Sequence, residues 1–422
     1  MTDGVVVVGG GLAGYVAALS AARAPSGATV RLLAPDGRRF RRETGLIDLL
    51  GYTPDGEGPV REPLSVLPDL PAEHPYSRVG VEGIRDALSL FADATGYDGG
   101  DSEANALVAT CTGEVTPTYL YPDSVTPGLV SDDREMLLVG FERVVDFDAA
   151  LAAAKLDDRL PYDVGSLTLT FPVDPGDGHP VERFADALDD NEDVGDDLPV
   201  RRALAGQIRN DLDIEPRIGF PAVLGRTDAD GVRSDLEAIL QADPFEIPLG
   251  PPNLPGTRLE ARLRSALDDA GVAVETGVTV TDIERADGRI VGLEADGGAS
   301  DGSARARYEA AEYVLATGGL AAGGLESDRE RIVEATVGCH VPQPAGRTEW
   351  VAPAFLDDQP FARIGLDVDD DLRPQGRDGT PELVNLRAAG RVLGGADLAA
   401  ERAGGGVAVA TGYRAGRLAV ER

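Results

Sequence analysis

Cysteine is almost absent from this chain of 422 residues, which contains only Cys111 and Cys339. The two thiols are too far apart in the sequence to give the paired spacing of a metal clip. An iron–sulfur cluster needs about four cysteine ligands, so this chain cannot hold one with its own thiols. So few cysteines also indicate a reducing compartment, where structural disulfides are rare.

Basic side chains are scarce as well, and lysine is nearly missing. The chain has 39 Lys and Arg residues against 73 Asp and Glu residues, a net charge of −34, and Lys155 is its single lysine. No basic stripe is available to neutralise phosphates, which excludes nucleic acid as a partner. A surface adapted to high salt explains the charge, because salt at about 1 M screens repulsion beyond roughly 3 Å. We therefore predict a halophilic source, with a cationic binding partner as the alternative.

Long uncharged segments are rare too. The one candidate covers residues 4–22, follows Asp3 directly and contains a glycine cluster. A signal peptide needs a basic start and a membrane span needs about 20 predominantly apolar residues, so we interpret this segment as folded structure. We expect a soluble chain without a membrane span, and no cluster of residues predicts a metal site.

The same segment carries the strongest motif of the chain. Four valines at 5–8 are typical of a buried strand, and an alanine-rich helix is predicted over 15–24. Between them lies the pattern G-x-G-x-x-G, with Gly9, Gly10, Gly11 and Gly14. Gly9 permits the tight turn, Gly11 leaves room for a phosphate, and Gly14 lets the helix pack on the strand. Because a helix N-terminus attracts an anion, we predict a nucleotide or flavin site here.

Three further glycine sites follow predicted strands or begin a helix in the last quarter of the chain. They are Thr317, Gly318 and Gly319, then Ala389 and Gly390, then Gly404, Gly405 and Gly406. Ligands bind beyond the carboxyl ends of the strands in a doubly wound sheet, so these sites predict one cofactor cleft assembled from both ends of the chain. The last glycine run suits the pyrimidine end of a flavin, because the dipole of the helix that follows stabilises negative charge there.

The predicted fold is α/β: a doubly wound, Rossmann-like flavin-binding domain with an inserted α+β cap domain. The flavin-binding domain is discontinuous and covers residues 1–105 and 256–422, and the insertion, which would contact the substrate or another subunit, covers residues 106–255. The predicted strands lie at 29–34, 136–141, 166–171, 217–225, 272–275, 278–284, 288–295, 312–316 and 383–388, and the predicted helices at 81–95, 148–154, 200–212, 257–270 and 407–417.

One residue that a dinucleotide site normally has is missing. Such sites place an acidic residue at the end of the second strand, about 20 residues after the glycines, where it holds the adenosine ribose. Here that position is Ala34 or Pro35, and Asp36 comes after the proline. A mononucleotide needs no such carboxylate, so we predict FMN as the cofactor, with FAD as the alternative.

The chain broadly resembles two-domain flavoproteins of the fumarate-reductase and glutathione-reductase type. It more closely resembles the B subunits of anaerobic glycerol-3-phosphate dehydrogenases, nearly from end to end. Besides the opening glycines, the motifs that carry this resemblance are Gly45–Leu50, His74–Tyr76, Pro221–Ala222, Gly225, Pro251–Pro252, Arg258–Leu259, Gly323–Leu325, Arg347–Trp350, Leu372–Pro374, Asn385–Leu386, Gly390–Gly395 and Gly404–Gly406. The acidic middle third matches less closely.

This resemblance implies one component of a three-subunit respiratory enzyme, in an archaeal version. Such an enzyme oxidises sn-glycerol 3-phosphate to dihydroxyacetone phosphate and passes electrons towards quinone, and its B subunit is assigned FMN. The implied partners are the FAD-containing A subunit and the iron–sulfur C subunit, which would hold this chain at the cytoplasmic face of the membrane. Two alternatives stay open: a stand-alone fumarate-reductase-like oxidoreductase acting on another small acid, and an electron-relay subunit whose flavin never meets substrate.

The candidate catalytic residues come from the matched motifs. Oxidation of a secondary alcohol needs a base for the hydroxyl proton and cations for the phosphate. We predict His74 as the base, and the alternative is a loop histidine that Pro75 fixes in place. We predict that Arg347 and Arg373 clamp the phosphate, unless each pairs with nearby carboxylates.

The loop after the second strand supplies further candidates. In related flavoproteins this region passes near the flavin ring, so we predict that Thr44 and Gly45 contact it, and an ordinary helix N-cap at Thr44 is the alternative. The basic loop at 38–42 meets an anion, a partner subunit or only solvent. Of the remaining histidines, His179 is expected in solvent and His340 in a structural role.

Overall fold

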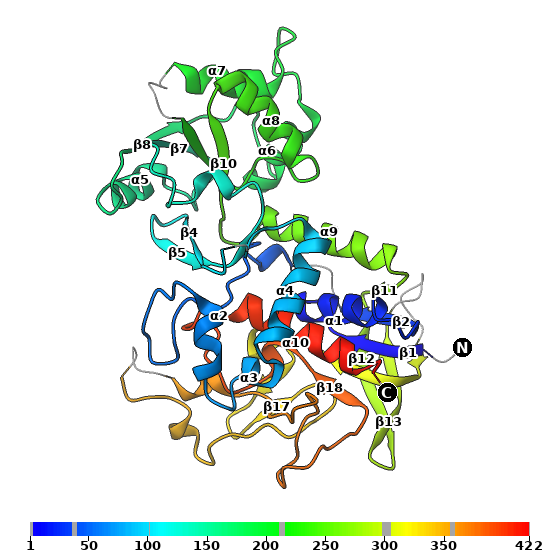
Figure 1. The fold of residues 1–422 in the computed structure, drawn as a ribbon. Coiled ribbons are helices and arrows are strands. Elements are labelled where there is room, and N and C mark those ends of the chain that lie inside the picture. Colours follow the sequence, from blue (N-terminus) through cyan, green and yellow to red (C-terminus); the bar gives the residue numbers. More distant parts are fainter. Residues whose placement is uncertain are drawn as a thin grey trace. The chain divides into compact units, whose positions relative to one another are not determined.

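The protein divides into two compact units in a computed structural model that describes residues 3–35, 40–100, 102–210, 216–297, 305–354 and 359–421. The first unit comprises Met1–Arg39, Asp48–Thr95 and Arg262–Arg422, and the second comprises Phe40–Ile47 and Gly96–Ala261. The second unit therefore takes in residues 40–47, 96–105 and 256–261 in addition to the insertion predicted at 106–255. Figure 1 shows the elements of both units.

A parallel five-stranded sheet forms the centre of the first unit, in the order β11-β2-β1-β15-β18. Its strands are β1 (Asp3–Val8), β2 (Val30–Ala34), β11 (Ala273–Thr276), β15 (Ala310–Leu315) and β18 (Leu386–Ala388). The valines of β1 are buried between two neighbouring strands, which explains their uninterrupted run. Strand order reverses direction between β1 and β15, and this switch point is where doubly wound sheets bind ligands.

Two helices of the first unit pack side by side, α1 near the start of the chain and α10 near its end (Figure 1). The helices of this unit are α1 (Leu12–Ala22), α2 (Pro63–Val66), α3 (Pro75–Val79), α4 (Val81–Thr95) and α10 (Gly404–Leu418). A Cβ added to Gly412 would lie 2.5 Å from the carbonyl oxygen of Ala13, and one on Gly416 would lie 2.2 Å from that of Ala17. Glycine at these two positions therefore allows the close packing.

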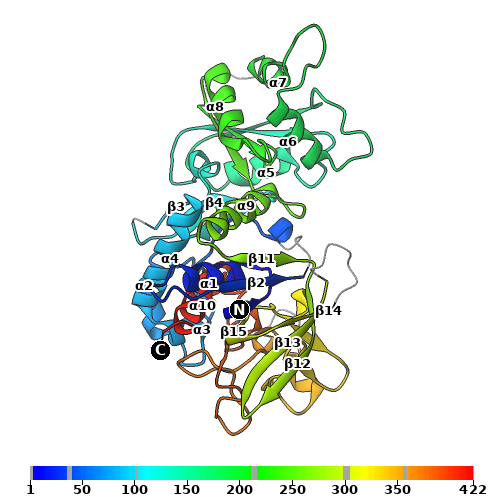
Figure 2. The same cartoon turned by 90° about the vertical axis from the view of Figure 1, so that its right-hand side faces the viewer.

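Smaller sheets complete the first unit. They are the antiparallel sheet of β12 (Thr279–Ala286), β13 (Arg289–Asp296) and β14 (Arg305–Tyr308), seen in Figure 2, and the pair β16 (Leu325–Ser327) and β17 (Ile332–Glu334). Buried Asn385 joins β13 to the segment before β18, because its amide group exchanges hydrogen bonds of 2.9 and 3.0 Å with the backbone of Ile290.

The second unit is built on a parallel four-stranded sheet in the order β10-β9-β7-β8. Its elements are β7 (Met136–Phe141), α5 (Ala149–Asp157), β8 (Val164–Leu169), α6 (Pro180–Asp190), α7 (Val200–Arg209), β9 (Arg217–Pro221), α8 (Ala229–Leu240) and β10 (Asp243–Ile247), with the pairs β3 (Asp98–Gly99) and β6 (Leu120–Tyr121), and β4 (Ala106–Ala109) and β5 (Val115–Thr118). Helix α9 (Leu254–Asp269) runs across the boundary between the two units. Because helices connect the parallel strands, this unit is α/β and the predicted α+β class is wrong for it.

The second sheet also has a switch point, between β7 and β9, but the core fills it. Four phenylalanines pack there, among them Phe141 at the end of β7 and Phe220 in β9. The rings of Phe171 and Phe184 stack with their centroids 4.0 Å apart, and Phe141 meets Phe171 edge to face at 5.2 Å. Side chains thus occupy the place where a ligand would bind in such a sheet.

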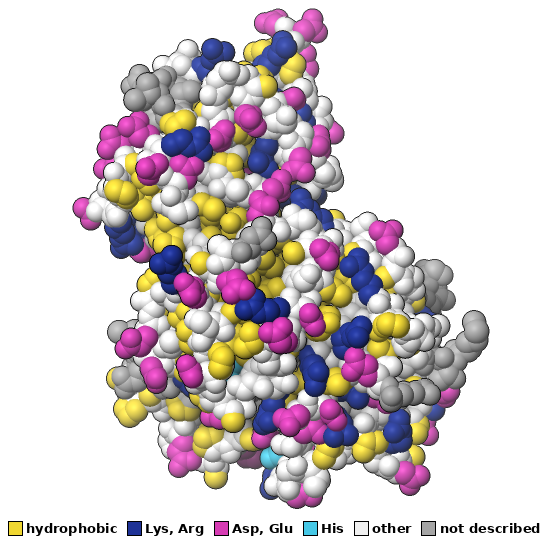
Figure 3. All heavy atoms as spheres, viewed as in Figure 1, with side chains coloured by type: hydrophobic (Ala, Val, Ile, Leu, Met, Phe, Trp, Pro, Cys, Tyr) yellow, Lys and Arg dark blue, Asp and Glu magenta, His cyan; other side chains and the backbone are white. Residues whose placement is uncertain are grey.

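Acidic side chains are spread over the face of the molecule that Figure 3 shows. Figure 3 shows Asp and Glu spread over the visible face, with arginines scattered between them and no continuous basic stripe on that face. In the part of the chain that the structure describes, no helix has both the length and the hydropathy needed to cross a bilayer.

Candidate functional site

The turn after β1 is packed so closely that two of its glycines cannot be replaced without moving backbone. Gly9 has a φ of +130°, and a Cβ on it would lie 2.1 Å from the carbonyl oxygen of Ala316, at the end of β15. A Cβ on Gly14 would lie 1.9 Å from the carbonyl oxygen of Gly9. These glycines therefore hold β1, α1 and β15 together, in the tight-turn and close-packing roles that the motif predicts.

Gly11 differs from its neighbours because the space beside it is open. A Cβ built on Gly11 meets no atom within 4 Å, and its backbone is extended with a φ of −100°. Gly11 is the N-cap of α1, and the first hydrogen bond within the helix is donated by Tyr15 N to Gly11 O at 3.1 Å. The preceding amides have no partner inside the helix. The turn therefore offers donors and space to a phosphate.

The ends of three neighbouring strands meet at this turn. Ala316 N donates to Val8 O at 2.8 Å, and Ala389 N donates to Leu315 O at 2.9 Å. Gly390, at φ +77°, is so close to α1 that its Cβ would lie 2.7 Å from the Cβ of Ala13. The predicted residues Thr317, Gly318 and Gly390 thus lie beside the Gly9–Gly14 turn.

The start of α10 lies close to the segment that follows β18. Gly404, Gly405 and Gly406 form its first turn. A Cβ on Gly406 would lie 2.2 Å from the hydroxyl oxygen of Tyr76, while Gly406 N donates to Asp48 O at 2.9 Å. Burial, followed by the negative charges of Glu401 and Asp48, raises the pKa of Tyr76 well above its usual value. The Tyr76 hydroxyl therefore stays protonated and can donate to a backbone carbonyl beside the helix start.

Two residues predicted to contact a flavin ring belong to the second unit. Thr44 and Gly45 lie in the segment Phe40–Ile47. The hydroxyl of Thr44 accepts a hydrogen bond of 3.3 Å from Leu46 N, and no helix follows, so the helix N-cap considered for Thr44 is not present. Gly45 has a φ of +77°, and its Cβ would lie 2.6 Å from the Cβ of Pro255. Glycine is required there for packing within the second unit.

His74 is buried and both of its ring nitrogens are engaged. Its Nδ1 accepts a hydrogen bond of 3.1 Å from Tyr76 N, and its Nε2 lies 2.9 Å from a carboxylate oxygen of Glu401. An Nδ1 that accepts carries no proton, so Nε2–H donates to Glu401. Neither His74 nor Glu401 is more than 1% exposed. The geometry suits a residue that positions the chain better than one that receives a proton from substrate.

The two arginines of the predicted phosphate clamp have different surroundings. Arg373 lies 2.8 Å from Asp369 and 3.1 Å from Asp371, so carboxylates already neutralise its charge. Arg347 is exposed in a short turn of 3-10 helix, and it forms no ion pair with any residue in the described ranges. Within the described ranges, Arg347 and Arg373 share no hydrogen-bond or ion-pair partner.

Arg391, which was not among the predicted site residues, lies beside the start of α10. Arg391 follows Gly390, and a Cβ on Gly404 would lie 2.8 Å from a guanidinium nitrogen of Arg391. A Cβ on Gly319 would lie 2.9 Å from the backbone oxygen of Arg391. Its side chain is exposed and, among the described residues, has no hydrogen-bond or ion-pair partner. Arg391 directly follows Gly390, the glycine after β18, and this was the sequence signal that could have identified it.

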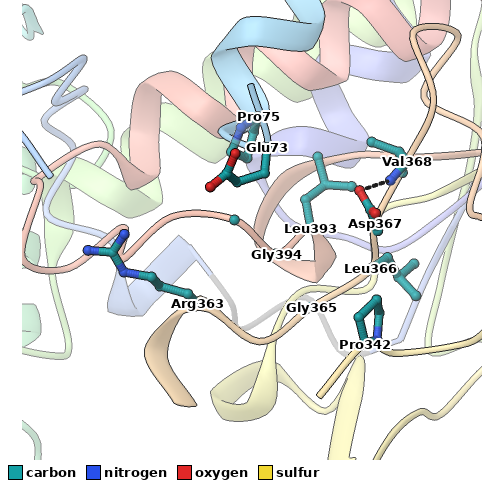
Figure 4. A pocket seen from close by; sticks show the side chains of 11 residues that line it. Glu73, Pro75, Pro342, Arg363, Gly365, Leu366, Asp367, Val368, Leu393 and Gly394 are labelled. Atoms are coloured by element: carbon teal, nitrogen blue, oxygen red, sulfur yellow. Dashed lines mark hydrogen bonds between the residues drawn. The ribbon is translucent and has the colours of Figure 1, made fainter. Parts of the chain in front are cut away.

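A cavity of about 200 Å³ lies next to His74 and to the segment after Arg391 (Figure 4). Its lining includes Glu73, Arg363, Asp367 and the backbone of Gly394 and Gly395. A carboxylate oxygen of Asp367 accepts from Val368 N at 3.0 Å. One guanidinium and two carboxylates line this cavity, and this mixture does not favour an anionic ligand.

The end of β2 carries no ribose-binding carboxylate among the residues that the structure describes. Ala34 ends the strand, and its Cβ lies 2.6 Å from where a Cβ of Gly10 would be. Asp36 and the first two residues of the basic loop, Arg38 and Arg39, lie outside the described residues. The turn itself, with an open cradle at Gly11, fits a phosphate-bearing flavin.

Comparisons with known proteins agree with this geometry. The model of the FAD binding domain family matches residues 4–407. The chain is 46% identical to the probable B subunit of an anaerobic glycerol-3-phosphate dehydrogenase from Halobacterium salinarum, over 99% of this chain and 97% of that protein. It is 31% identical to the B subunit of the anaerobic glycerol-3-phosphate dehydrogenase of Vibrio cholerae, over 97% and 95%.

Among solved structures, a flavocytochrome c3 fumarate reductase in its open conformation covers 99% of this chain and 78% of its own, at 13% identity and a TM-score of 0.44. The family match and the near-complete coverage of the glycerol-3-phosphate dehydrogenase relatives decide the assignment. The chain belongs to the FAD binding domain family and, within it, to the B subunits of anaerobic glycerol-3-phosphate dehydrogenases.

Proposed function

We propose that this protein is the flavin-carrying B subunit of an anaerobic glycerol-3-phosphate dehydrogenase. One observation carries the flavin part: the glycine turn after β1 lies against the ends of β15 and β18, and the segment after β18 lies against the start of α10. The relatives' name supports the substrate, sn-glycerol 3-phosphate, because the resemblance extends over nearly the whole chain. The reaction is oxidation of the secondary alcohol to dihydroxyacetone phosphate.

The cofactor would be held by backbone more than by side chains. The open space beside Gly11, at the N-terminus of α1, would take a phosphate, and the positive end of α10 at Gly404 would stabilise negative charge on the flavin. A bound flavin supplies the ability to accept a hydride equivalent. We propose FMN, since β2 ends in Ala34 without an acidic partner for an adenosine ribose; the family description favours FAD.

Catalytic roles are proposed for three side chains. A base must take the hydroxyl proton of the substrate, and cations must hold its phosphate. His74 stays a predicted base, although a proton from substrate would displace its bond to Tyr76 N. In the predicted clamp, Arg347 is available to an anion, whereas Arg373 would have to leave Asp369 and Asp371.

We propose that the chain works in a complex. The relatives are named as one lettered subunit of their enzyme, which implies partner subunits. The proposed partners are an FAD-containing A subunit and an iron–sulfur C subunit, and the C subunit would pass electrons towards quinone at the cytoplasmic face of the membrane. With two cysteines, this chain cannot supply such a cluster with its own thiols.

An electron-relay role is the second candidate, and one observation favours it. The best predicted base is buried with both nitrogens occupied. A relay protein needs a bound flavin but no base in contact with substrate. In the whole complex, a His74→Gln variant that keeps its flavin and its activity would support the relay role. A large loss of activity with flavin retained would support direct oxidation.

The decisive experiment identifies the flavin. The protein is folded in molar KCl with FMN and FAD together, freed of unbound flavin, and treated with acid to release what is bound. Mass spectrometry then distinguishes the two cofactors. A yellow protein that releases FMN supports the proposal as stated, release of FAD corrects the cofactor, and a colourless protein contradicts the flavin function.

A further inference from the structure

Arg391 lies beside the N-terminal end of one helix, and the residue before it lies beside the first turn of another. Its neighbour Gly390 contacts Ala13 in the first turn of α1, and its guanidinium lies beside Gly404 at the start of α10. Each helix N-terminus carries a partial positive charge of about half a unit, because its amides have no partner within the helix. The guanidinium therefore lies beside the positive end of α10, and the adjoining Gly390 lies beside the first turn of α1.

The surrounding chain does nothing to balance this charge. It has 73 acidic residues, and its arginines are often paired, as Arg387 is with Glu312 and Arg373 with Asp369. Within the described ranges, however, no carboxylate lies at ion-pair distance from Arg391. No acidic side chain among the described residues competes for this guanidinium. A bound anion would contact the guanidinium and be stabilised by the positive end of α10 as well.

We propose that Arg391 binds the phosphoryl group of the flavin and thereby selects phosphorylated flavins over riboflavin. The inference rests on the proposed flavin function and adds a residue to it. The planar guanidinium presents paired N–H donors that match two phosphate oxygens, which a single ammonium group does not. Gly390 brings the arginine close to the first turn of α1, and the open space beside Gly11, the N-cap of that helix, leaves room for the phosphate.

The proposal also explains how the site can bind an anion in a chain with a net charge of −34. At molar salt the long-range repulsion is screened within about 3 Å, so only groups in direct contact matter. A guanidinium in contact with phosphate remains effective under these conditions. Selectivity for phosphate should therefore persist at high salt.

The test compares three flavins on the full-length protein. Dissociation constants of FMN, FAD and riboflavin are measured by quenching of flavin fluorescence in 2 M KCl, for the wild type and for Arg391→Gln and Arg391→Lys. Arg377→Gln is the matched control, because Arg377 also follows a glycine, is exposed and has no ion-pair partner among described residues. Circular dichroism confirms that each variant is folded.

We expect Arg391→Gln to weaken the binding of FMN and FAD by about ten- to a hundred-fold, which is the range for loss of a charged hydrogen bond. Riboflavin should bind as before, Arg391→Lys should lie between, and Arg377→Gln should match the wild type. Equal weakening of riboflavin, or unchanged FMN and FAD, would overturn the inference alone. Failure of the wild-type protein to bind any flavin would instead overturn the proposed function, and this inference with it.

Discussion

Nε2 of His74 lies 2.9 Å from the carboxylate of Glu401, and both side chains are almost completely buried. The pair joins residues that are 327 positions apart in the chain. The other carboxylate oxygen of Glu401 accepts from Asp397 N, and its backbone oxygen accepts from Gly51 N and Tyr52 N. Glu401 thus organises the loop that leads into α10, and His74 keeps that carboxylate satisfied.

Removing one partner of this pair should destabilise the protein strongly. His74→Ala leaves the Glu401 carboxylate buried without its donor and removes the cap of α3. We expect the free energy of unfolding to fall by about 3–5 kcal/mol, the usual cost of breaking a buried pair. Urea denaturation in 2 M KCl, followed by circular dichroism, measures this loss.

Glu401→Gln is the conservative comparison, because its amide oxygen can still accept from His74 Nε2–H. We expect a loss of about 1–2 kcal/mol for this variant. Equal stability of His74→Ala and the wild type would show that the pair does not organise the loop before α10.

The three glycines of the motif should respond differently to the same added methyl group. Gly9→Ala and Gly14→Ala force a Cβ to within about 2 Å of a carbonyl oxygen and should cost about 1–3 kcal/mol or more of stability. Gly11→Ala meets no atom, so its stability should change by less than about 0.5 kcal/mol.

Flavin binding should separate Gly11 from the other two. The methyl of Gly11→Ala enters the space left for a phosphate, and we expect FMN to bind about tenfold more weakly or worse, at least ~1.4 kcal/mol. Thermal melting without flavin and fluorescence titration with it give the two quantities. If the Gly11→Ala variant binds FMN with full affinity, the phosphate does not bind at this turn.

The sequence was sufficient to predict the sheet of the first unit because its signals are local. A run of valines followed by spaced glycines specifies strand, turn and helix within about ten residues, and the resulting close contacts of Gly9 and Gly14 confirm those two structural roles. The fold class and the glycerol-3-phosphate dehydrogenase family follow from the same motifs taken in order.

What was missed depends on contacts between distant residues. The partner of His74 lies at position 401, and no local pattern reveals such a pairing. Thr44 follows β2 in sequence yet belongs to the second unit. The class of the second sheet depends on strand direction, which single strands do not show. Arg391 is conspicuous only when α1, α10 and their positive ends are seen together.

Stability should fall at alkaline pH because of Tyr308, whose hydroxyl donates to Glu275 at 2.6 Å. Burial, this hydrogen bond and the carboxylate charge raise its pKa to about 12. In the unfolded chain a tyrosine loses its proton near pH 10. The contribution of Tyr308 to the free energy of unfolding is therefore complete below about pH 10, and it is lost as the pH rises towards 12.

A comparison of two proteins at alkaline pH isolates the effect of this tyrosine. Tm is measured from pH 8 to pH 12 in 2 M KCl for the wild type and for Tyr308→Phe. Phenylalanine does not titrate, so the variant should start lower and lose less Tm above pH 10. Parallel curves would mean that Tyr308 ionises alike in both states; Tyr76, whose pKa is also raised, contributes to the shared decline.

Salt should stabilise this protein over a wide range. The net charge of −34 repels itself, and acidic side chains are scattered over the face seen in Figure 3. Raising KCl from about 0.1 M to 1 M shortens the screening length from roughly 10 to 3 Å, so Tm should rise steadily. The near relative from Halobacterium salinarum agrees with adaptation to salt. Calorimetry in KCl checks the trend, and a flat Tm would contradict it.

Arg217 is the buried arginine on which the second unit depends most. Its side chain is 0% exposed at the start of β9. It donates to the backbone oxygens of Leu129 and Asp132, each at 3.0 Å, and to that of Arg134. The guanidinium also lies over the ring of Tyr162, 5.0 Å from its centroid. One side chain thus fixes the segment before β7.

Replacing Arg217 by methionine should therefore lower the stability of the protein. The carbonyl oxygens would stay buried without donors, so we expect a loss of about 3–5 kcal/mol in the free energy of unfolding. Arg217→Lys keeps the charge but has fewer donors and no planar group to stack, and should lose less stability than the methionine variant.

The control is Arg143→Gln, because Arg143 is an exposed arginine of the same unit with no ion-pair partner among described residues. This variant should change stability by under about 0.5 kcal/mol. Urea unfolding in 2 M KCl compares all three, and a methionine variant as stable as the control would show that solvent satisfies those carbonyl groups.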